Sequence, residues 1–253
     1  MNDPFQISTI DDLLNLQGNI EYWDKNFVLM NDIDMSGYTG YFRIGYDNPA
    51  TPFTGTFDGG EHTINNFILD YPLNTHLGFF GYTQNAVIKN LGLTNISITG
   101  THTLGGLIAM SRNTTVNNCY VTGYIKGEGD YVGGLIAVNF SNSIVKNSYS
   151  SININSYETV RVPYMVGFEI HYKYVNYYFG FIGGLIGSNT SSDIINCYSE
   201  GQLTTGGYGG GLVGRNDQAD ILNCYSKTTV YPRGLSPSSA ASANGFASFA
   251  GYV

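Results

Sequence analysis

A two-part motif that recurs along the chain constrains its fold more than any other feature. The sequence GGLIG at residues 183–187 is followed by NCYS at 196–199, and GGLVG at 210–214 is followed by NCYS at 223–226. The two copies lie 27 residues apart and keep the same internal spacing. A period in the twenties, built from short apolar runs separated by turn residues, is typical of a solenoid of stacked coils.

The same motif occurs upstream in weaker form. GGLI at residues 105–108 precedes NNCY at 117–120, and GGLI at 133–136 precedes KNSY at 146–149. A degenerate copy has GFFG at 78–81 and KNLG at 89–92. These units are rich in β-branched and aromatic residues and lack helical periodicity. One coil cannot bury its own apolar face, so we expect each coil to pair with the next through parallel strands. The sequence predicts an all-β parallel β-helix.

Equivalent residues of successive coils should lie about 4.8 Å apart, the spacing between neighbouring strands. This predicts an asparagine ladder at a bend, where the side chains can bond the backbone; its members are Asn90, Asn118, Asn147, Asn196 and Asn223. The apolar residue two positions earlier should point into the core: Ile88, Val116, Val145, Ile194 and Ile221. The paired glycines permit either a turn at positive φ or a close approach of neighbouring coils.

The three cysteines, Cys119, Cys197 and Cys224, occupy the same position of the repeat. Cys197 and Cys224 fall in adjacent coils, near enough for a disulfide by distance alone. In-register neighbours on parallel strands seldom offer disulfide geometry, so we expect free, buried thiols. The spacing does not resemble that of a zinc site.

The N-terminal segment has the features of a cap. Residues 5–17 read as a short helix, with Ser8 as its N-cap and an apolar face that includes Leu13 and Leu16. Such a helix would cover the strand edges that the first coil exposes. A first strand is expected at residues 27–35.

Acidic residues in three places are candidates for function. Asp32, Asp34 and Ser36 alternate as at the start of a calcium loop, but Arg43 stands where that loop needs its last carboxylate, and an Asx turn explains the pattern equally. Asp193 and Asp220 should lie on adjacent coils, either as a solvated pair, as a weak calcium site or as a carboxylate pair for polysaccharide cleavage. In the third place, Asp58 and His62 flank a Gly-Gly turn, and we interpret His62 as a partly buried residue that bonds the turn.

Between residues 150 and 183 the period lengthens to 50 residues, which implies an insertion of about 22 residues. Its alternating aromatic pattern favours a hairpin or a long loop that projects from the solenoid. Tyrosine-rich surfaces suit sugars and proteins, although such rings can also simply cover apolar surface. The candidate ligand-binding residues are Tyr164, Phe168, Tyr172, Tyr174, Tyr177 and Tyr178.

The repeat residues resemble the GLUG motif of bacterial surface proteins, and FTGTFDGGEHTI at 53–64 resembles the segment that usually precedes it. The resemblance implies a right-handed parallel β-helix within an extracellular or cell-surface protein, such as an adhesin, a hemagglutinin-like protein or an IgA-cleaving peptidase. In such proteins the helix is not the catalytic unit. We therefore expect a cap at residues 1–26, a β-helix at 27–231 with an insertion at about 153–178, and a Ser/Ala-rich linker with a possible capping strand at 232–253.

The composition also limits which partners the chain is expected to bind. The net charge is −8 and the pI about 4.7, which disfavours nucleic acid as a partner. No apolar run is long enough for a membrane span, and the N-terminus lacks the pattern of a signal peptide. We expect a non-catalytic adhesion or scaffold module without a cofactor, calcium aside, that binds a glycan or a protein on a host or partner cell and does not insert into a membrane. The alternative is a polysaccharide lyase, hydrolase or tailspike-type depolymerase.

Overall fold

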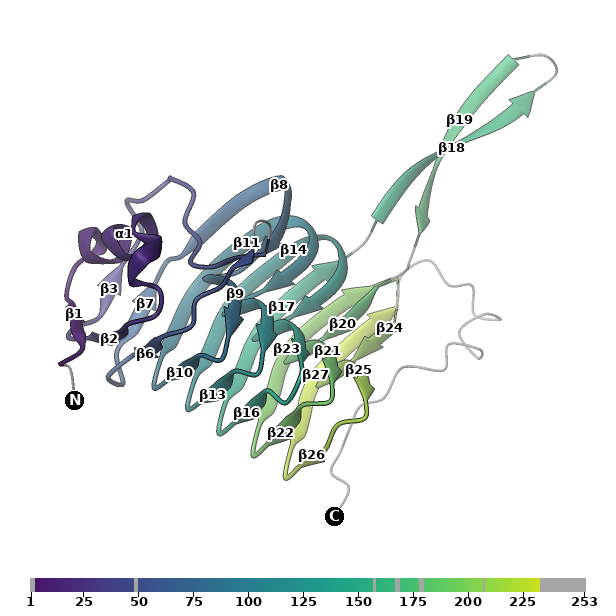
Figure 1. Ribbon diagram of the computed structural model, residues 1–253. Coiled ribbons are helices and arrows are strands. Elements are labelled where there is room, and N and C mark those ends of the chain that lie inside the picture. Colours follow the sequence, from purple (N-terminus) through teal and green to yellow (C-terminus); the bar gives the residue numbers. More distant parts are fainter. Residues whose placement is uncertain are drawn as a thin grey trace.

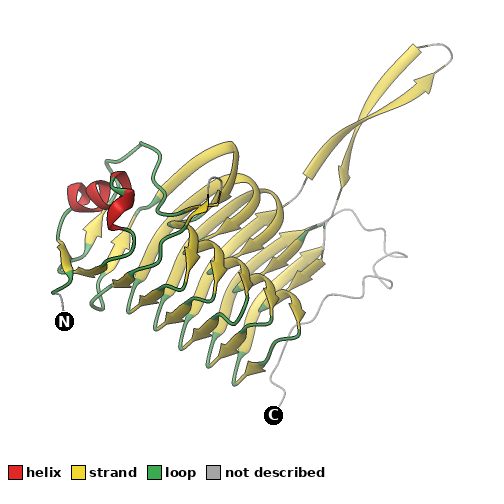
Figure 2. Cartoon of the chain, in the orientation of Figure 1, coloured by secondary structure: helices red, strands yellow, loops and turns green. Residues whose placement is uncertain are grey.

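The computed structural model describes residues 3–47, 50–156, 158–166, 169–177, 180–206 and 208–232. Parallel strands wind into a β-helix whose coils stack from the N-terminus to the C-terminus (Figure 1). Three sheets run along the stack, and short turns join them within each coil (Figure 2). The predicted all-β parallel β-helix is therefore confirmed.

The first sheet has eight strands, and all its pairings are parallel. Its strands are short because each coil contributes only the segment before the asparagine bend. In spatial order they are β1 (Phe5–Ile7), β2 (Asn26–Leu29), β6 (Thr56–Asp58), β10 (Val87–Lys89), β13 (Thr115–Asn117), β16 (Ile144–Lys146), β22 (Asp193–Ile195) and β26 (Ile221–Leu222).

The second sheet follows the bend and contains the longest strands. Its main path joins β3 (Ile33–Asp34), β7 (Thr63–Asn65), β11 (Gly92–Gly105), β14 (Tyr120–Gly133), β17 (Tyr149–Ser156), β23 (Tyr198–Thr205) and β27 (Tyr225–Pro232), with β8 (Ile68–Leu77), β20 (Phe181–Gly183) and β24 (Tyr208–Gly210) beside it. The third sheet joins β9 (Phe80–Gln84), β12 (Ile108–Arg112), β15 (Ile136–Phe140), β21 (Ile186–Thr190) and β25 (Val213–Asp217).

Two antiparallel pairs depart from the coil pattern. One joins β4 (Tyr46–Asp47) to β5 (Ala50–Thr51), and the other joins β18 (Glu158–Val166) to β19 (Glu169–Tyr177). Among the described residues no helix is long and apolar enough to cross a membrane.

The core consists of stacked apolar rows. Ile88, Val116, Val145 and Ile194 are fully buried, whereas Ile221 in the last described coil is only partly buried. Each buried aliphatic side chain contributes about 1.5–3 kcal/mol relative to an exposed one. The less regular N-terminal coils are filled by larger rings instead: Phe42, Phe53, Phe57, Phe67, Phe79 and Phe80.

The paired glycines serve close approach rather than a turn at positive φ. A Cβ atom on Gly183 would lie 1.9 Å from the Ile186 carbonyl oxygen, and one on Gly133 would lie 1.8 Å from the Ile136 carbonyl oxygen. Neither glycine has a positive φ. The first glycine of the motif therefore lies at a tight corner, where the backbone before and after the corner is so close that no side chain larger than hydrogen fits.

The N-terminal helix is shorter than the sequence pattern predicts. Residues 5–7 form strand β1, which pairs with β2, so the β-helix begins before the expected cap ends. Helix α1 spans Ile10–Gly18, and its N-cap is Thr9 rather than Ser8. Thr9 and Asp12 form a capping box, which satisfies both backbone N–H groups. The predicted apolar face is confirmed, because Leu13 and Leu16 are buried.

Candidate functional site

The inserted hairpin β18–β19 is the most pronounced departure from the repeat, and Figure 1 shows it extending away from the stack. Ser156 and Phe181, which flank it, are register partners of Thr205 and Tyr208 in the next coil. In the sequence of the next coil, two residues (206 and 207) separate these partners, whereas residues 157–180 separate Ser156 from Phe181. The hairpin is thus an insertion into one corner of an otherwise conventional coil.

The hairpin carries four of the six predicted ligand-binding residues on its paired strands. Tyr164 pairs with His171, Tyr172 with Pro163, Tyr174 with Arg161 and Tyr177 with Glu158. The other two, Phe168 and Tyr178, lie outside the described residues. Tyr172 and Tyr174 stand two positions apart on one strand.

The side chains described on the hairpin are exposed. Met165 is 63% exposed, and His171 Nε2 lies 3.5 Å from Glu169 Oε2 at the tip end.

An aromatic stack lies at the foot of the hairpin. The rings of Tyr131, Phe181 and Tyr208 stack in register, with centroids 6.0 and 5.2 Å apart. The Arg215 guanidinium lies 5.4 Å from the centroid of Phe181 and pairs with Asp217 at 3.2 Å. Tyr208 is half exposed.

A second aromatic stack was not predicted. Tyr120, Tyr149, Tyr198 and Tyr225, here called the tyrosine column, have ring centroids 4.7–5.0 Å apart and nearly parallel planes. The signal was present in the sequence, because each ring directly follows the cysteine position of the repeat. Once strands pair in register, an aromatic residue at a fixed repeat position has to stack on its neighbours.

The asparagine ladder lies at the bend between the first two sheets, and all five residues have positive φ between 50° and 55°. Their side-chain amides donate to other side chains rather than to the backbone. Asn223 donates to Asn196 and Asn196 to Asn147, both at 3.2 Å. Asn147 donates to Asn117, so the run is interrupted there, and a second run leads from Asn118 to Asn90 at 3.0 Å.

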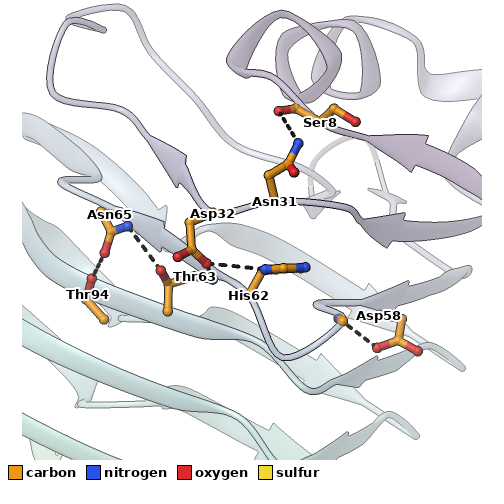
Figure 3. A network of polar contacts seen from close by, with 9 residues as sticks. Ser8, Asn31, Asp32, Asp58, His62, Thr63, Asn65 and Thr94 are labelled. Atoms are coloured by element: carbon orange, nitrogen blue, oxygen red, sulfur yellow. Dashed lines mark hydrogen bonds and ion pairs between the residues drawn. The ribbon is translucent and has the colours of Figure 1, made fainter.

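The Asp32–Asp34–Ser36 segment binds the neighbouring coil. Asp32 Oδ1 accepts from the Thr63 backbone N–H at 2.7 Å and lies 3.5 Å from His62 Nδ1 (Figure 3). Asp34 closes the predicted Asx turn by accepting from the Ser36 N–H at 2.9 Å, and it also accepts from the Asn66 amide at 2.7 Å. These hydrogen bonds lower the pKa of both carboxyl groups.

Figure 3 also shows how the first coils are tied together by polar side chains. Asn31 donates to the Ser8 carbonyl at 3.5 Å, Asn65 donates to Thr63 at 3.0 Å, and Thr94 donates to Asn65. Asp58 accepts from the Gly60 N–H, which closes the turn beside His62.

Asp193 and Asp220 precede the register partners Ile194 and Ile221 and therefore occupy equivalent places in adjacent coils. Asp193 is half-buried and Asp220 is exposed. In the part of the chain that the structure describes, no three His, Cys, Asp or Glu residues are close enough to share a metal ion.

The three cysteines are free and buried, as predicted. Burial raises the pKa of Cys119 to about 12. Cys224 Sγ accepts a hydrogen bond from the Cys197 backbone N–H at 3.3 Å. The shared hydrogen bond between these two thiols raises the pKa of Cys197 and lowers that of Cys224.

Comparison with known proteins agrees with the repeat assignment. Residues 182–204 and 205–231 match the GLUG motif family. Halomucin of Haloquadratum walsbyi is 32% identical over 162 residues, and immunoglobulin A1 protease of Streptococcus sanguinis is 31% identical over 140 residues. The matches cover 59% and 55% of this chain but only 2% and 6% of those proteins.

Two solved structures share the fold. An immunoglobulin A1 protease-like protein from Bacteroides ovatus superposes with a TM-score of 0.63 at 24% identity, over 90% of this chain and 67% of that one. An IgA1 protease superposes with a TM-score of 0.56 at 18% identity, over 88% of this chain and 19% of that one. Residues 182–231 therefore contain two GLUG motifs, and they lie on a parallel β-helix of the kind seen in these solved structures.

Proposed function

We propose that this chain is a non-catalytic module of a secreted or surface-exposed protein, in which the β-helix is a stiff support and the β18–β19 hairpin is the recognition element. The partner is a glycan or a protein on another cell surface. The observation that carries the proposal is the insertion itself: a paired hairpin extends from one corner of a regular stack.

The support's rigidity favours a presenting role. The coils from β6 to β25 are bonded to one another along three sheets, and the apolar row formed by Ile88, Val116, Val145 and Ile194 is fully buried. A recognition element held by rigid strands loses less conformational entropy on binding than one on a free loop. An insertion on one face of a repeat protein is a common location for its binding surface.

The hairpin's composition suits contact with a partner. Tyrosine combines a large apolar ring with a hydroxyl and is enriched at interfaces, and four tyrosines lie on β18 and β19. The exposed Met165 adds apolar surface between them and the turn. The relatives named as an IgA1 protease and a halomucin favour an extracellular setting for this chain.

The next coil, which lacks the insertion, shows how the hairpin can be removed to test this proposal. Residues 157–180 are replaced by Gly-Gly, because two residues separate the equivalent positions Thr205 and Tyr208 in the sequence of the next coil. Binding of the parent and the excised chain is measured on arrays of soluble glycans and on immobilised immunoglobulin A1. We expect the excised chain to keep its circular dichroism and to lose at least tenfold in affinity for every probe that the parent binds.

Point substitutions test whether the tyrosine side chains, rather than the hairpin backbone, are responsible for binding. Tyr172→Ala, Tyr174→Ala and Tyr177→Ala are combined, and Tyr124→Ala, an exposed tyrosine on β14, is the matched control. We expect the triple variant to lose binding and the control to keep it. Full binding by the excised chain, or by the triple variant, refutes the hairpin's role.

A further inference from the structure

The tyrosine column places four phenol rings in van der Waals contact along the solenoid axis. Successive centroids are 4.9, 4.7 and 5.0 Å apart, and successive planes differ by 2°, 5° and 2°. Each neighbouring pair is also a register pair of strands β14, β17, β23 and β27. The rings are therefore held face to face by the backbone and do not depend on side-chain contacts alone.

The two ends of the column differ. At the N-terminal end, Tyr120 lies over Gly92, where an added Cβ would come within 2.5 Å of the ring. At the other end, Tyr225 is 42% exposed, and Lys227 Nζ lies 5.5 Å from its centroid. The interior rings of Tyr149 and Tyr198 are half-buried, so their outer edges remain accessible.

We propose that the tyrosine column is a site of oxidative modification, at which a peroxide-driven one-electron oxidant couples neighbouring rings into dityrosine and so joins adjacent coils covalently. This goes beyond the proposed recognition role, and it depends only on the column's geometry. Stacked, in-register phenols are favourable for coupling because two radicals formed on neighbouring rings already lie within contact distance and cannot diffuse apart.

The reaction balances as follows. Burial raises the pKa of Tyr149 and Tyr198, so each reacts as the neutral phenol and loses one electron to the oxidant and one proton to solvent. The two phenoxyl radicals join at their Cε carbons, which forms one C–C bond. Each of these carbons then regains aromaticity by passing its hydrogen, through solvent, to the phenol oxygen. The two electrons and two protons convert one hydrogen peroxide to two waters, and the linked peptides lose two hydrogens.

The chain contains two internal controls. In the stack of Tyr131, Phe181 and Tyr208, phenylalanine occupies the middle position, so no two tyrosines are neighbours. Tyr41 and Tyr71 are also in contact, with centroids 4.8 Å apart, but their planes lie at 88°. Equal separation with perpendicular rings isolates the effect of parallel stacking.

The test treats the whole chain, at low protein concentration, with a haem peroxidase and hydrogen peroxide. Dityrosine fluorescence is recorded, and linked peptides are identified by mass spectrometry. We expect links at Tyr120–Tyr149, Tyr149–Tyr198 and Tyr198–Tyr225, and none of these in a sample oxidised in denaturant. Equal yields in native and denatured samples, or native links confined to other exposed tyrosines such as Tyr22, overturn the proposal.

Two substitutions test whether the yield of dityrosine depends on the stacked contacts. Tyr198→Phe keeps the stack but leaves one of the three Tyr–Tyr contacts, so the column's dityrosine should fall about threefold if the contacts are independent. Phe181→Tyr should create a link to Tyr208, because those rings are 5.2 Å apart at 16°. Failure of Phe181→Tyr to gain that link, or an unchanged yield in Tyr198→Phe, contradicts coupling through the stack. The linked chain should also unfold at a higher temperature than the unlinked chain.

Discussion

The carboxylate of Asp58 accepts a hydrogen bond from the side-chain amide of Asn90 at 3.0 Å. Asp58 is therefore the N-terminal end of a short run of hydrogen-bonded amides. Asn118 donates to Asn90 in the same direction. Another run, formed by Asn95 and Asn66, has the same arrangement: Asn95 donates to Asn66, and Asn66 donates to Asp34. Aligned amides polarise one another, and an ionised acceptor makes the strongest terminus for such a run. Each of these two short runs therefore ends on an aspartate, whereas the run from Asn223 ends on Asn117.

Replacing Asp58 tests this terminus. Asp58→Ala removes the acceptor for Asn90 and Gly60 and also the ion pair with Lys89 at 2.9 Å. We expect the free energy of unfolding to fall by about 1–3 kcal/mol. Asp58→Asn keeps an acceptor oxygen and should cost less. Urea unfolding followed by circular dichroism measures both, with the exposed Asp70→Ala as a control expected to stay within about 0.5 kcal/mol. If Asp58→Ala were as stable as the control, Asp58 would not stabilise the fold as the end of the amide run.

The corner glycine provides a sharper steric test. In Gly183→Ala the new Cβ would lie 1.9 Å from the Ile186 carbonyl oxygen, and a backbone atom cannot move aside as a side chain can. We expect a loss of about 1–3 kcal/mol or more. Gly37→Ala is the matched control, because nothing lies within 4 Å of its added Cβ. Thermal unfolding of the two variants should differ clearly, and equal midpoints would show that the corner relaxes freely.

The repeat made the fold predictable because parallel in-register stacking leaves few other places for its residues. Once the position of Asn196 and that of Asn223 are known to be equivalent, the neighbouring rows follow from the strand period of two. This is why the inward row at Val116 and the free thiol at Cys119 could be predicted before the structure.

Features outside the repeat were harder to predict. The apolar spacing near residues 5–7 predicts a helix, yet β2 offers an edge that Phe5–Ile7 can pair with. Ser8 and Thr9 are equally good N-cap residues by sequence, and only the reciprocal hydrogen bonds between Thr9 and Asp12 show that Thr9 is the N-cap. The ladder termini at Asp34 and Asp58 required knowing which coils are neighbours.

The thiols give a prediction about accessibility. At neutral pH a maleimide should label Cys224 before Cys119, because Cys224 is 6% exposed and has a lowered pKa, whereas Cys119 is 1% exposed with a pKa of about 12. Peptide mass spectrometry after short labelling times measures both rates. Cys119 should react only on unfolding. Equal labelling rates in the native chain would mean that the last coil is no more open than the middle ones.

Acid should destabilise the chain through carboxylates that accept hydrogen bonds in the folded state. Four aspartates have a folded-state pKa below the ordinary value of 3.8. The main causes are the Ser8 N–H for Asp12, the Thr63 N–H for Asp32 and the Asn66 amide for Asp34, while for Asp58 burial opposes the shift and Lys89, Gly60 and Asn90 outweigh it.

The sign of the pH dependence follows from these lowered values. Above the unfolded pKa of 3.8 the aspartates are ionised in both states, so their contribution to stability is fully present. As the pH falls through 3.8 towards the lower folded values, the unfolded chain takes up protons first, and stability is lost. We expect the thermal midpoint to be nearly constant between about pH 7 and 5 and to fall steeply below about pH 4. Asp58→Asn should show a shallower fall than the parent. A parent chain that gained stability on acidification, or an Asp58→Asn profile parallel to that of the parent, would contradict the assignment of Asp58 as an ionised ladder terminus.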